Sequence, residues 1–156
     1  MNIPLPTREA TIALGRRLAR LLGAGDLVVL TGDLGAGKTT LTKGIAEGLR
    51  VQGPVSSPTF IIARTHPGPV PLVHVDAYRL QGAEEIDDLD LDADLAQSIT
   101  VVEWGEGLVE GLTDSRLEVA LVRPRGGRET GRFARIRPVG PRWEGVDLAA
   151  LAAGPR

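Results

Sequence analysis

The sequence predicts an α/β fold with a mainly parallel central sheet, flanked by helices and bordered by antiparallel edge strands near the C-terminus. Three observations support this prediction. Short apolar runs such as 27–30 are typical of strands that are buried on both faces of a parallel sheet. Residues 39–49 follow such a run closely and carry apolar side chains at helical spacing. Residues 116–123 and 131–137 alternate polar and apolar side chains, which is typical of an antiparallel pair with one solvated face.

The expected order of elements begins with a helix that Thr7 can cap and whose first turn holds Glu9. Apolar residues recur on one face of this helix up to Leu22, and Gly23-Ala24-Gly25 ends it. The strand 27–30 and the helix 39–49 come next. The other expected segments are a loop at 54–58, a strand at 59–64, a turn at 66–69, a strand at 72–76, an acidic helical stretch at 84–94, a strand at 99–103 and the two alternating strands.

The composition indicates one globular domain. The chain has 156 residues, of which 42% are hydrophobic and 24% are charged. This length suits a single hydrophobic core but not two. We expect the domain to cover residues 1–138, and residues 139–156, rich in Gly, Ala and Pro, to form a partly ordered tail.

Several classes of protein and site are disfavoured by what the sequence lacks. The absence of Cys excludes disulfides, thiolate zinc sites and a Cys nucleophile. The N-terminus has no apolar stretch of the signal-peptide type, and no run approaches the ~18 apolar residues of a membrane span. A cytoplasmic location is therefore expected. The net charge of −2 argues against a dedicated nucleic-acid binder, which usually has a marked basic excess.

The most specific motif is Gly-Asp-Leu-Gly-Ala-Gly-Lys-Thr at 32–39, placed between a predicted strand and a predicted helix. Strand, Gly-rich loop and helix are the setting of the P-loop, in which backbone N–H groups converge on phosphate oxygens at a helix N-terminus. Gly35 and Gly37 give the loop the freedom to wrap closely. Lys38 supplies a positive charge near the β- and γ-phosphates, and the Thr39 hydroxyl can ligate Mg²⁺. The sequence therefore predicts a P-loop NTPase fold.

A P-loop NTPase also needs a carboxylate at the end of a neighbouring strand, to hold the metal directly or through water. Asp76 and Glu103 each end an apolar strand, where a parallel sheet presents its ligand crevice. The sequence alone does not say which strand lies beside the P-loop strand. We favour Glu103 for the Mg²⁺ site because its strand is more uniformly apolar, and we expect Asp76 to orient the attacking water or gate the site. The alternative for either acid is a helix N-cap or a surface turn.

The remaining polar features are less specific. Ser56-Ser57-Pro58-Thr59 could form a switch-like loop near the γ-phosphate. His66 and His74 are poor metal-ligand candidates because no second His or Cys completes a set, and His74 is interpreted as a packed strand residue. Trp104 could cover the site or anchor a partner, although packing is the default. The arginines within 123–142 form either a solvated edge hairpin or a contact surface for an anionic partner.

Taken together, these motifs resemble those of the TsaE family, also called YjeE. The resemblance covers about residues 7–117, and its motifs occur in order along the chain. They are Glu-Ala-Thr at 9–11, Gly-Asp-Leu-Gly-Ala-Gly-Lys-Thr-Thr at 32–40, Val-Ser-Ser-Pro-Thr-Phe at 55–60, His-Val-Asp-Ala-Tyr-Arg-Leu at 74–80 and Glu-Trp at 103–104. The region after Arg123 matches nothing diagnostic.

The resemblance implies a small bacterial ATPase that supports the synthesis of N6-threonylcarbamoyladenosine on tRNA. In that family TsaC makes the threonylcarbamoyl-adenylate, TsaD with TsaB carries out the transfer, and TsaE binds the TsaB–TsaD assembly and resets it by ATP hydrolysis. Contact with tRNA would be indirect, through these partners. The implied cofactors are ATP and Mg²⁺.

The resemblance also implies roles for individual residues. Lys38, Asp76 and Glu103 would be needed for catalysis, with Thr39 and Glu103 holding Mg²⁺. Thr11 would lie near the nucleotide base. The phosphates would bind to Gly35, Ala36, Gly37, Lys38, Thr39 and Thr40.

Two other functions use the same phosphate motif. A small-molecule kinase would need a lid with arginines that reach the transferred phosphoryl group, and the arginines of 123–142 are the candidates for it. A non-catalytic module would change its affinity for a partner when nucleotide binds. The choice of ATP over GTP comes from the resemblance, since the Asn-Lys-x-Asp motif of GTPases is absent.

Overall fold

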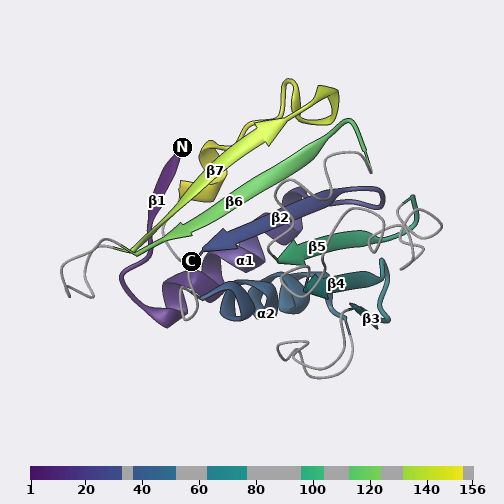
Figure 1. The fold of residues 1–156 in the computed structure, drawn as a ribbon, viewed down its shortest axis with the longest axis horizontal. Coiled ribbons are helices and arrows are strands. Elements are labelled where there is room, and N and C mark those ends of the chain that lie inside the picture. The colour runs from purple at the N-terminus through teal and green to yellow at the C-terminus, as the bar shows by residue number, and fades with distance from the viewer. Residues whose placement is uncertain (33–36, 52–62, 77–95, 104–112, 124–131, 153–156) are drawn as a thin grey trace.

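The computed structural model describes residues 1–32, 37–51, 63–76, 96–103, 113–123 and 132–152. In these ranges one seven-stranded sheet has the order β1-β7-β6-β2-β5-β4-β3 (Figure 1). The strands are β1 (Asn2–Pro4), β2 (Leu27–Gly32), β3 (Ala63–His66), β4 (Leu72–Asp76), β5 (Ile99–Glu103), β6 (Arg116–Val122) and β7 (Phe133–Val139). The helices are α1 (Arg8–Leu21), α2 (Lys38–Leu49) and two short 3₁₀ helices, Pro141–Trp143 and Ala149–Ala152.

The centre of the sheet is parallel, as predicted. Strand β2 pairs in parallel with both β5 and β6, and β5 also pairs in parallel with β4. The predicted antiparallel pair near the C-terminus is confirmed as β6 and β7. Strand β5 is buried along its whole length, as expected for a strand with parallel neighbours on both sides.

The sheet edges hold two features that the sequence pattern did not predict. Strand β3 pairs antiparallel with β4, so the second edge of the sheet is antiparallel as well. Strand β1 pairs antiparallel with β7, with Ile3 opposite Ala134. A three-residue strand is too short to show alternation, and Pro4 argues against a strand in the sequence. The part of the predicted strand 59–64 before Ala63, and the acidic stretch 84–94, lie outside the described residues.

Both α-helices pack on the same face of the sheet in the described part of the chain (Figure 1). Helix α1 begins as predicted, because the Thr7 hydroxyl accepts a hydrogen bond from the Ala10 N–H at 3.0 Å. The core joins α1 and α2 to alternate residues of β2, which are Val28 and Leu30. The two helices approach so closely that a Cβ atom on Gly44 would collide with the Ile12 carbonyl. None of the described helices is long and apolar enough to cross a membrane.

Residues beyond 138, which the sequence suggested to be a tail, pack on the domain as far as they are described. Strand β7 continues to Val139, and the side chains of Trp143 and Leu151 join the core. Arg17 of α1 donates a hydrogen bond from Nε to the Leu151 carbonyl at 3.0 Å. Residues 139–152 therefore cover one end of α1.

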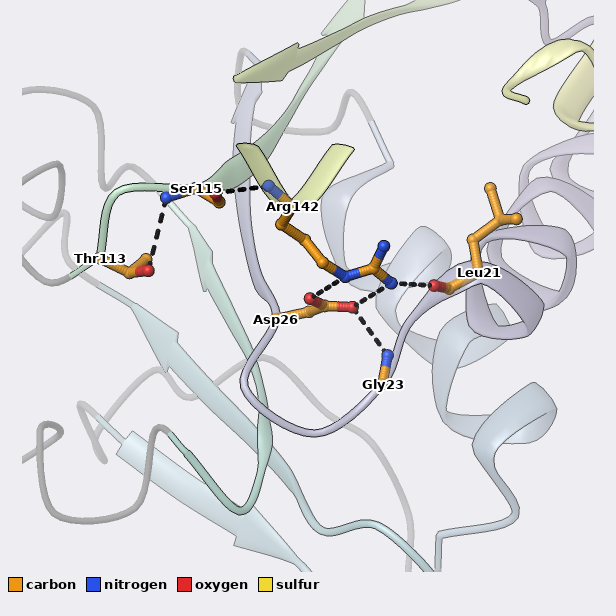
Figure 2. A network of polar contacts seen from close by, with 6 residues as sticks. All are labelled: Leu21, Gly23, Asp26, Thr113, Ser115 and Arg142. Carbon is orange, nitrogen blue, oxygen red and sulfur yellow. Dashed lines mark hydrogen bonds and ion pairs between the residues drawn. The ribbon is translucent and has the colours of Figure 1, made fainter. Parts of the chain in front are cut away.

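A polar network around the buried Asp26 carboxylate attaches this C-terminal segment to the turn between α1 and β2 (Figure 2). Arg142 donates to both oxygens of Asp26, from Nε at 2.9 Å and from Nη2 at 3.1 Å, and Nη2 also donates to the Leu21 carbonyl at 2.9 Å. Asp26 further accepts from the Gly23 N–H at 2.8 Å, and the Arg142 N–H donates to the Ser115 hydroxyl at 3.0 Å. Because Asp26 directly precedes β2, this Arg142–Asp26 network fixes the start of the strand that leads to the Gly-rich loop.

We predict that Arg142→Ala lowers the free energy of unfolding by about 2 kcal/mol, because hydrogen bonds to charged groups contribute about that amount and Asp26 would stay buried without its partner. The Asp26 side chain is only 4% exposed. Arg142→Lys should recover only part of this stability, since an ammonium cannot make the two-pronged contact. Urea unfolding followed by circular dichroism measures both effects.

Arg137→Ala is the matched control. Its side chain is 70% exposed and makes a single 3.3 Å ion pair with Glu118. Removal of such a pair should change the free energy of unfolding by about 0.5 kcal/mol or less. Equal losses in the Arg137 and Arg142 variants would show that the Arg142–Asp26 network has no special structural role.

Candidate functional site

The candidate site lies where the parallel strands β2, β5 and β4 end side by side. Strand β5 is the direct neighbour of β2, with Glu103 opposite Leu30, and β4 is next, with Asp76 opposite Glu103. The sequence left open which acidic strand would adjoin β2, and the structure places the strand that ends in Glu103 there. The ends of adjacent parallel strands in an open α/β sheet are the usual position of a ligand crevice.

The first turn of α2 forms the second wall of this site. Gly37 is the N-cap of α2 and has φ of +109°, a conformation that residues with a side chain rarely adopt. Gly37 provides no side-chain cap for this helix end, where the helix dipole favours an anion. Gly35 and Ala36, predicted to bind phosphate, lie outside the described residues.

Lys38 is buried at the start of α2, with only 6% of its surface exposed. Its ammonium donates a hydrogen bond from Nζ to the carbonyl of Gly32, the last residue of β2, at 2.6 Å. This contact holds the charge at the end of β2, beside the strand that ends in Glu103. A buried ammonium is strongly desolvated, so an anion brought close to it would be attracted more than at an open surface.

The threonine residues near the start of α2 differ in how deeply they are buried. Thr39 and Thr40 are half-buried in the first turn of α2. Thr42, one turn later, is fully buried and donates its hydroxyl to the Lys38 carbonyl at 2.9 Å. Thr11 of α1 lies next to the loop, because a Cβ atom built on Gly37 would be 3.8 Å from the Thr11 methyl group. Thr11 therefore lies beside Gly37, at the start of α2.

Glu103 is buried and makes a close contact with His74 on the neighbouring strand. The His74 Nε2 atom lies 2.5 Å from Glu103 Oε2, and the two side chains are 0% and 6% exposed. His74 is packed in a strand, as predicted, but its hydrogen bond to Glu103 was missed. The sequence alone carries no signal for this pair, because the contact depends on the register of β4 and β5, which puts His74 opposite Val101, two residues before Glu103 on the same face.

Asp76 ends β4 in a half-buried position beside Glu103. No group of three or more His, Cys, Asp or Glu side chains within the described ranges could hold a metal ion on its own. Mg²⁺ at a nucleotide site does not need such a group, because it binds one or two protein ligands, phosphate oxygens and water. The Thr39 hydroxyl and the Glu103 carboxylate are oxygen ligands of the kind that Mg²⁺ prefers, so the residues present fit that ion.

The described arginines of 123–142 are divided between two places. Arg123 directly follows β6 and Arg132 directly precedes β7, at the edge of the sheet where β2 also ends. The others lie away from this edge. Arg135 and Arg137 of β7 line a hollow of about 290 Å³ together with Val29 and Thr31 of β2. Val29 and Thr31 alternate with the two β2 residues in the helix-covered core, so the hollow lies on the opposite face of the sheet. Arg142 belongs to the network with Asp26. Trp104, the segment 56–59 and Arg128 lie outside the described residues.

The sequence of this chain is similar to those of known proteins over most of its length. The family model described as threonylcarbamoyl adenosine biosynthesis protein TsaE matches residues 5–130. The tRNA threonylcarbamoyladenosine biosynthesis protein TsaE of Streptomyces coelicolor is 57% identical over 145 residues, covering 89% of this chain and 97% of that protein. The protein of the same name from Bacillus subtilis is 41% identical over 138 residues, covering 87% of this chain and 84% of that protein.

A solved structure is similar to this chain in fold and in sequence. The crystal structure of YdiB from Bacillus subtilis superposes with a TM-score of 0.73 at 34% sequence identity, covering 92% of this chain and 88% of that one. The matched segments include the strands that carry His74, Asp76 and Glu103. The chain therefore belongs to the TsaE family, which takes part in the biosynthesis of threonylcarbamoyladenosine in tRNA.

Proposed function

We propose that this protein is a cytoplasmic, Mg²⁺-dependent P-loop ATPase required for threonylcarbamoyladenosine modification of tRNA. It acts on a TsaB–TsaD-like assembly and does not itself perform the transfer. The observation that carries the proposal is the buried Glu103 carboxylate on the strand next to β2, beside the uncapped start of α2 and the Lys38 ammonium. A phosphate cradle and a metal-binding acid are the two parts that phosphoryl chemistry needs from such a protein.

Nucleotide binding uses the loop and the first turn of α2. The backbone N–H groups of 35–40 hold the phosphate chain, with the favourable potential of the helix start behind them. The Lys38 ammonium exchanges its hydrogen bond with the Gly32 carbonyl for contacts with the β- and γ-phosphate oxygens. Thr11, packed beside Gly37, borders the nucleotide near its base.

Hydrolysis depends on residues at the strand ends. Thr39 and Glu103 hold Mg²⁺, which neutralises charge on the phosphate oxygens when it is bound. Asp76, beside Glu103 on β4, orients the attacking water or gates the site. Burial of Glu103 keeps this carboxylate out of bulk solvent, so its charge acts more strongly on a nearby cation than a surface carboxylate would.

A supporting role in tRNA modification also agrees with the charge of the chain. The net charge of −2 provides no general attraction for tRNA, so tRNA would be reached through partner proteins. A small-molecule kinase would place arginines beside the transferred phosphoryl group. Arg135 and Arg137 of β7 instead line a hollow on the far face of the sheet. Arg123 and Arg132 flank the paired ends of β6 and β7 near the end of β2, so the kinase is distinguished by its product and not by the position of these arginines.

We predict that Lys38→Ala weakens binding of ATP about 10-fold to 100-fold, because it removes a charge-assisted contact to the phosphates. Binding of a fluorescent ATP analogue measures the change. Lys43→Ala is the matched control, since Lys43 is the chain's only other lysine and lies in the same helix. Equal affinities for the wild type and the Lys38 variant would contradict the assignment of the phosphate site.

We predict that Glu103→Ala lowers the rate of phosphate release at least about 100-fold while ATP still binds, because the phosphate cradle stays intact and the metal site does not. Phosphate release should be weak for the wild-type protein alone and stronger with TsaB and TsaD. Phosphorylation of a small acceptor, with no effect of the partners, would instead identify a kinase. Binding of ATP without phosphate release under any condition would identify a nucleotide-dependent interaction module.

A further inference from the structure

His74 is the one buried imidazole at the candidate site within the described part of the chain. It lies in β4, between the aliphatic residues Val73 and Val75, and its side chain is completely buried. Its Nε2 atom contacts Glu103 Oε2 at 2.5 Å, while Nδ1 has no hydrogen-bond partner among the described residues. Burial of a polar ring with one unpaired nitrogen costs free energy that an aliphatic side chain would not.

The contact with Glu103 explains why an imidazole occupies this position. A carboxylate that binds a metal ion can only accept hydrogen bonds, so in the proposed metal site the hydrogen of this contact would belong to His74 Nε2. The same contact fixes the orientation of the Glu103 side chain. Among the described residues it is the single hydrogen bond of that carboxylate, so Oε2 is engaged and Oε1 is left for another ligand.

Because only one oxygen of Glu103 is hydrogen-bonded to His74, the carboxylate can favour one cation over another. Mg²⁺ binds each carboxylate through one oxygen in a strict octahedral arrangement, whereas Ca²⁺ readily binds both oxygens of a carboxylate. A donor that keeps Oε2 occupied opposes two-oxygen binding and therefore disfavours the larger ion. Partners of this kind, which orient a ligand without touching the metal, typically change metal affinity 10-fold to 100-fold when removed.

We propose that His74 is a positioning residue that presents Glu103 as a one-oxygen ligand and so sets a preference for Mg²⁺ over Ca²⁺ at this site. The inference rests on the proposed role of Glu103 in metal binding. It adds a role for a residue that does not itself contact the metal or the nucleotide.

The first test uses the wild-type protein without nucleotide or metal. The chain contains two histidines, so imidazole ¹⁵N NMR gives two spin systems, and a His66→Asn variant assigns them. The expected result is a His74 ring with its hydrogen on Nε2, a bare Nδ1 and slow exchange of the Nε2 hydrogen with solvent. A hydrogen on Nδ1 with a bare Nε2 would overturn the proposal, because His74 could then not donate to Glu103.

The second test compares cations in variants of His74. Affinity for a non-hydrolysable ATP analogue is measured in EDTA, in MgCl₂ and in CaCl₂ for the wild type, His74→Leu and His74→Gln. In the Leu variant we expect the gain in affinity that Mg²⁺ provides to fall about 10-fold. The gain from Ca²⁺ should fall less, and the affinity in EDTA should stay the same. The Gln variant retains an N–H donor at a similar distance from the backbone, so it should keep most of the preference for Mg²⁺ over Ca²⁺.

The outcomes separate this inference from the proposed function. One outcome is that Mg²⁺ strengthens nucleotide binding by the wild type, and that the gains in affinity from Mg²⁺ and from Ca²⁺ have the same ratio in the Leu variant. In that case the positioning role of His74 is wrong, and the proposed metal site stands. If the wild type shows no cation effect, the metal role of Glu103 fails and the inference fails with it. Circular dichroism reports whether each variant is folded. The NMR test uses the wild-type protein, so it remains valid even if the Leu variant does not fold.

Discussion

The parallel pairing of β2 with β5 is the constraint on which the rest of the site depends. It places Glu103 beside Leu30, two residues before the end of the strand that leads into the Gly-rich loop. Strand β5 lies between the parallel strands β2 and β4 and is buried along its whole length, so Glu103 is largely withdrawn from water. The proposed ATPase depends on this pairing, because it needs an acid beside the phosphate-binding loop.

Much of the molecule serves to hold β2 in this position. The helices α1 and α2 pack closely at Gly44 and cover the face that carries Val28 and Leu30. The Arg142–Asp26 network fixes the residue directly before β2 from the far end of the sequence. The C-terminal segment thus holds the start of β2 in place as far as it is described, where the sequence suggested a partly ordered tail.

The sequence predicted most of the central sheet, because buried parallel strands leave a strong apolar pattern. It also marked the two acids at strand ends, Asp76 and Glu103, but left open which of their strands lies next to β2. Short elements and long-range contacts were harder to predict. Strand β1 has too few residues for a periodic signal, and the partner of His74 is 29 residues away in the chain. The role of Arg142 was equally hidden, since its acid partner lies 116 residues before it. Such pairs become apparent only when strand order and register are known.

If the ends of β2 and β5 hold a nucleotide together with a metal ion, a crystal structure with a non-hydrolysable ATP analogue and Mn²⁺, located by its anomalous scattering, will show both there. We expect the phosphates at the start of α2 and the Mn²⁺ ion bound by the Thr39 hydroxyl, with Glu103 coordinating it directly or through a water molecule. A nucleotide bound elsewhere, for example in the hollow beside Arg135 and Arg137 on the opposite face, would contradict this expectation.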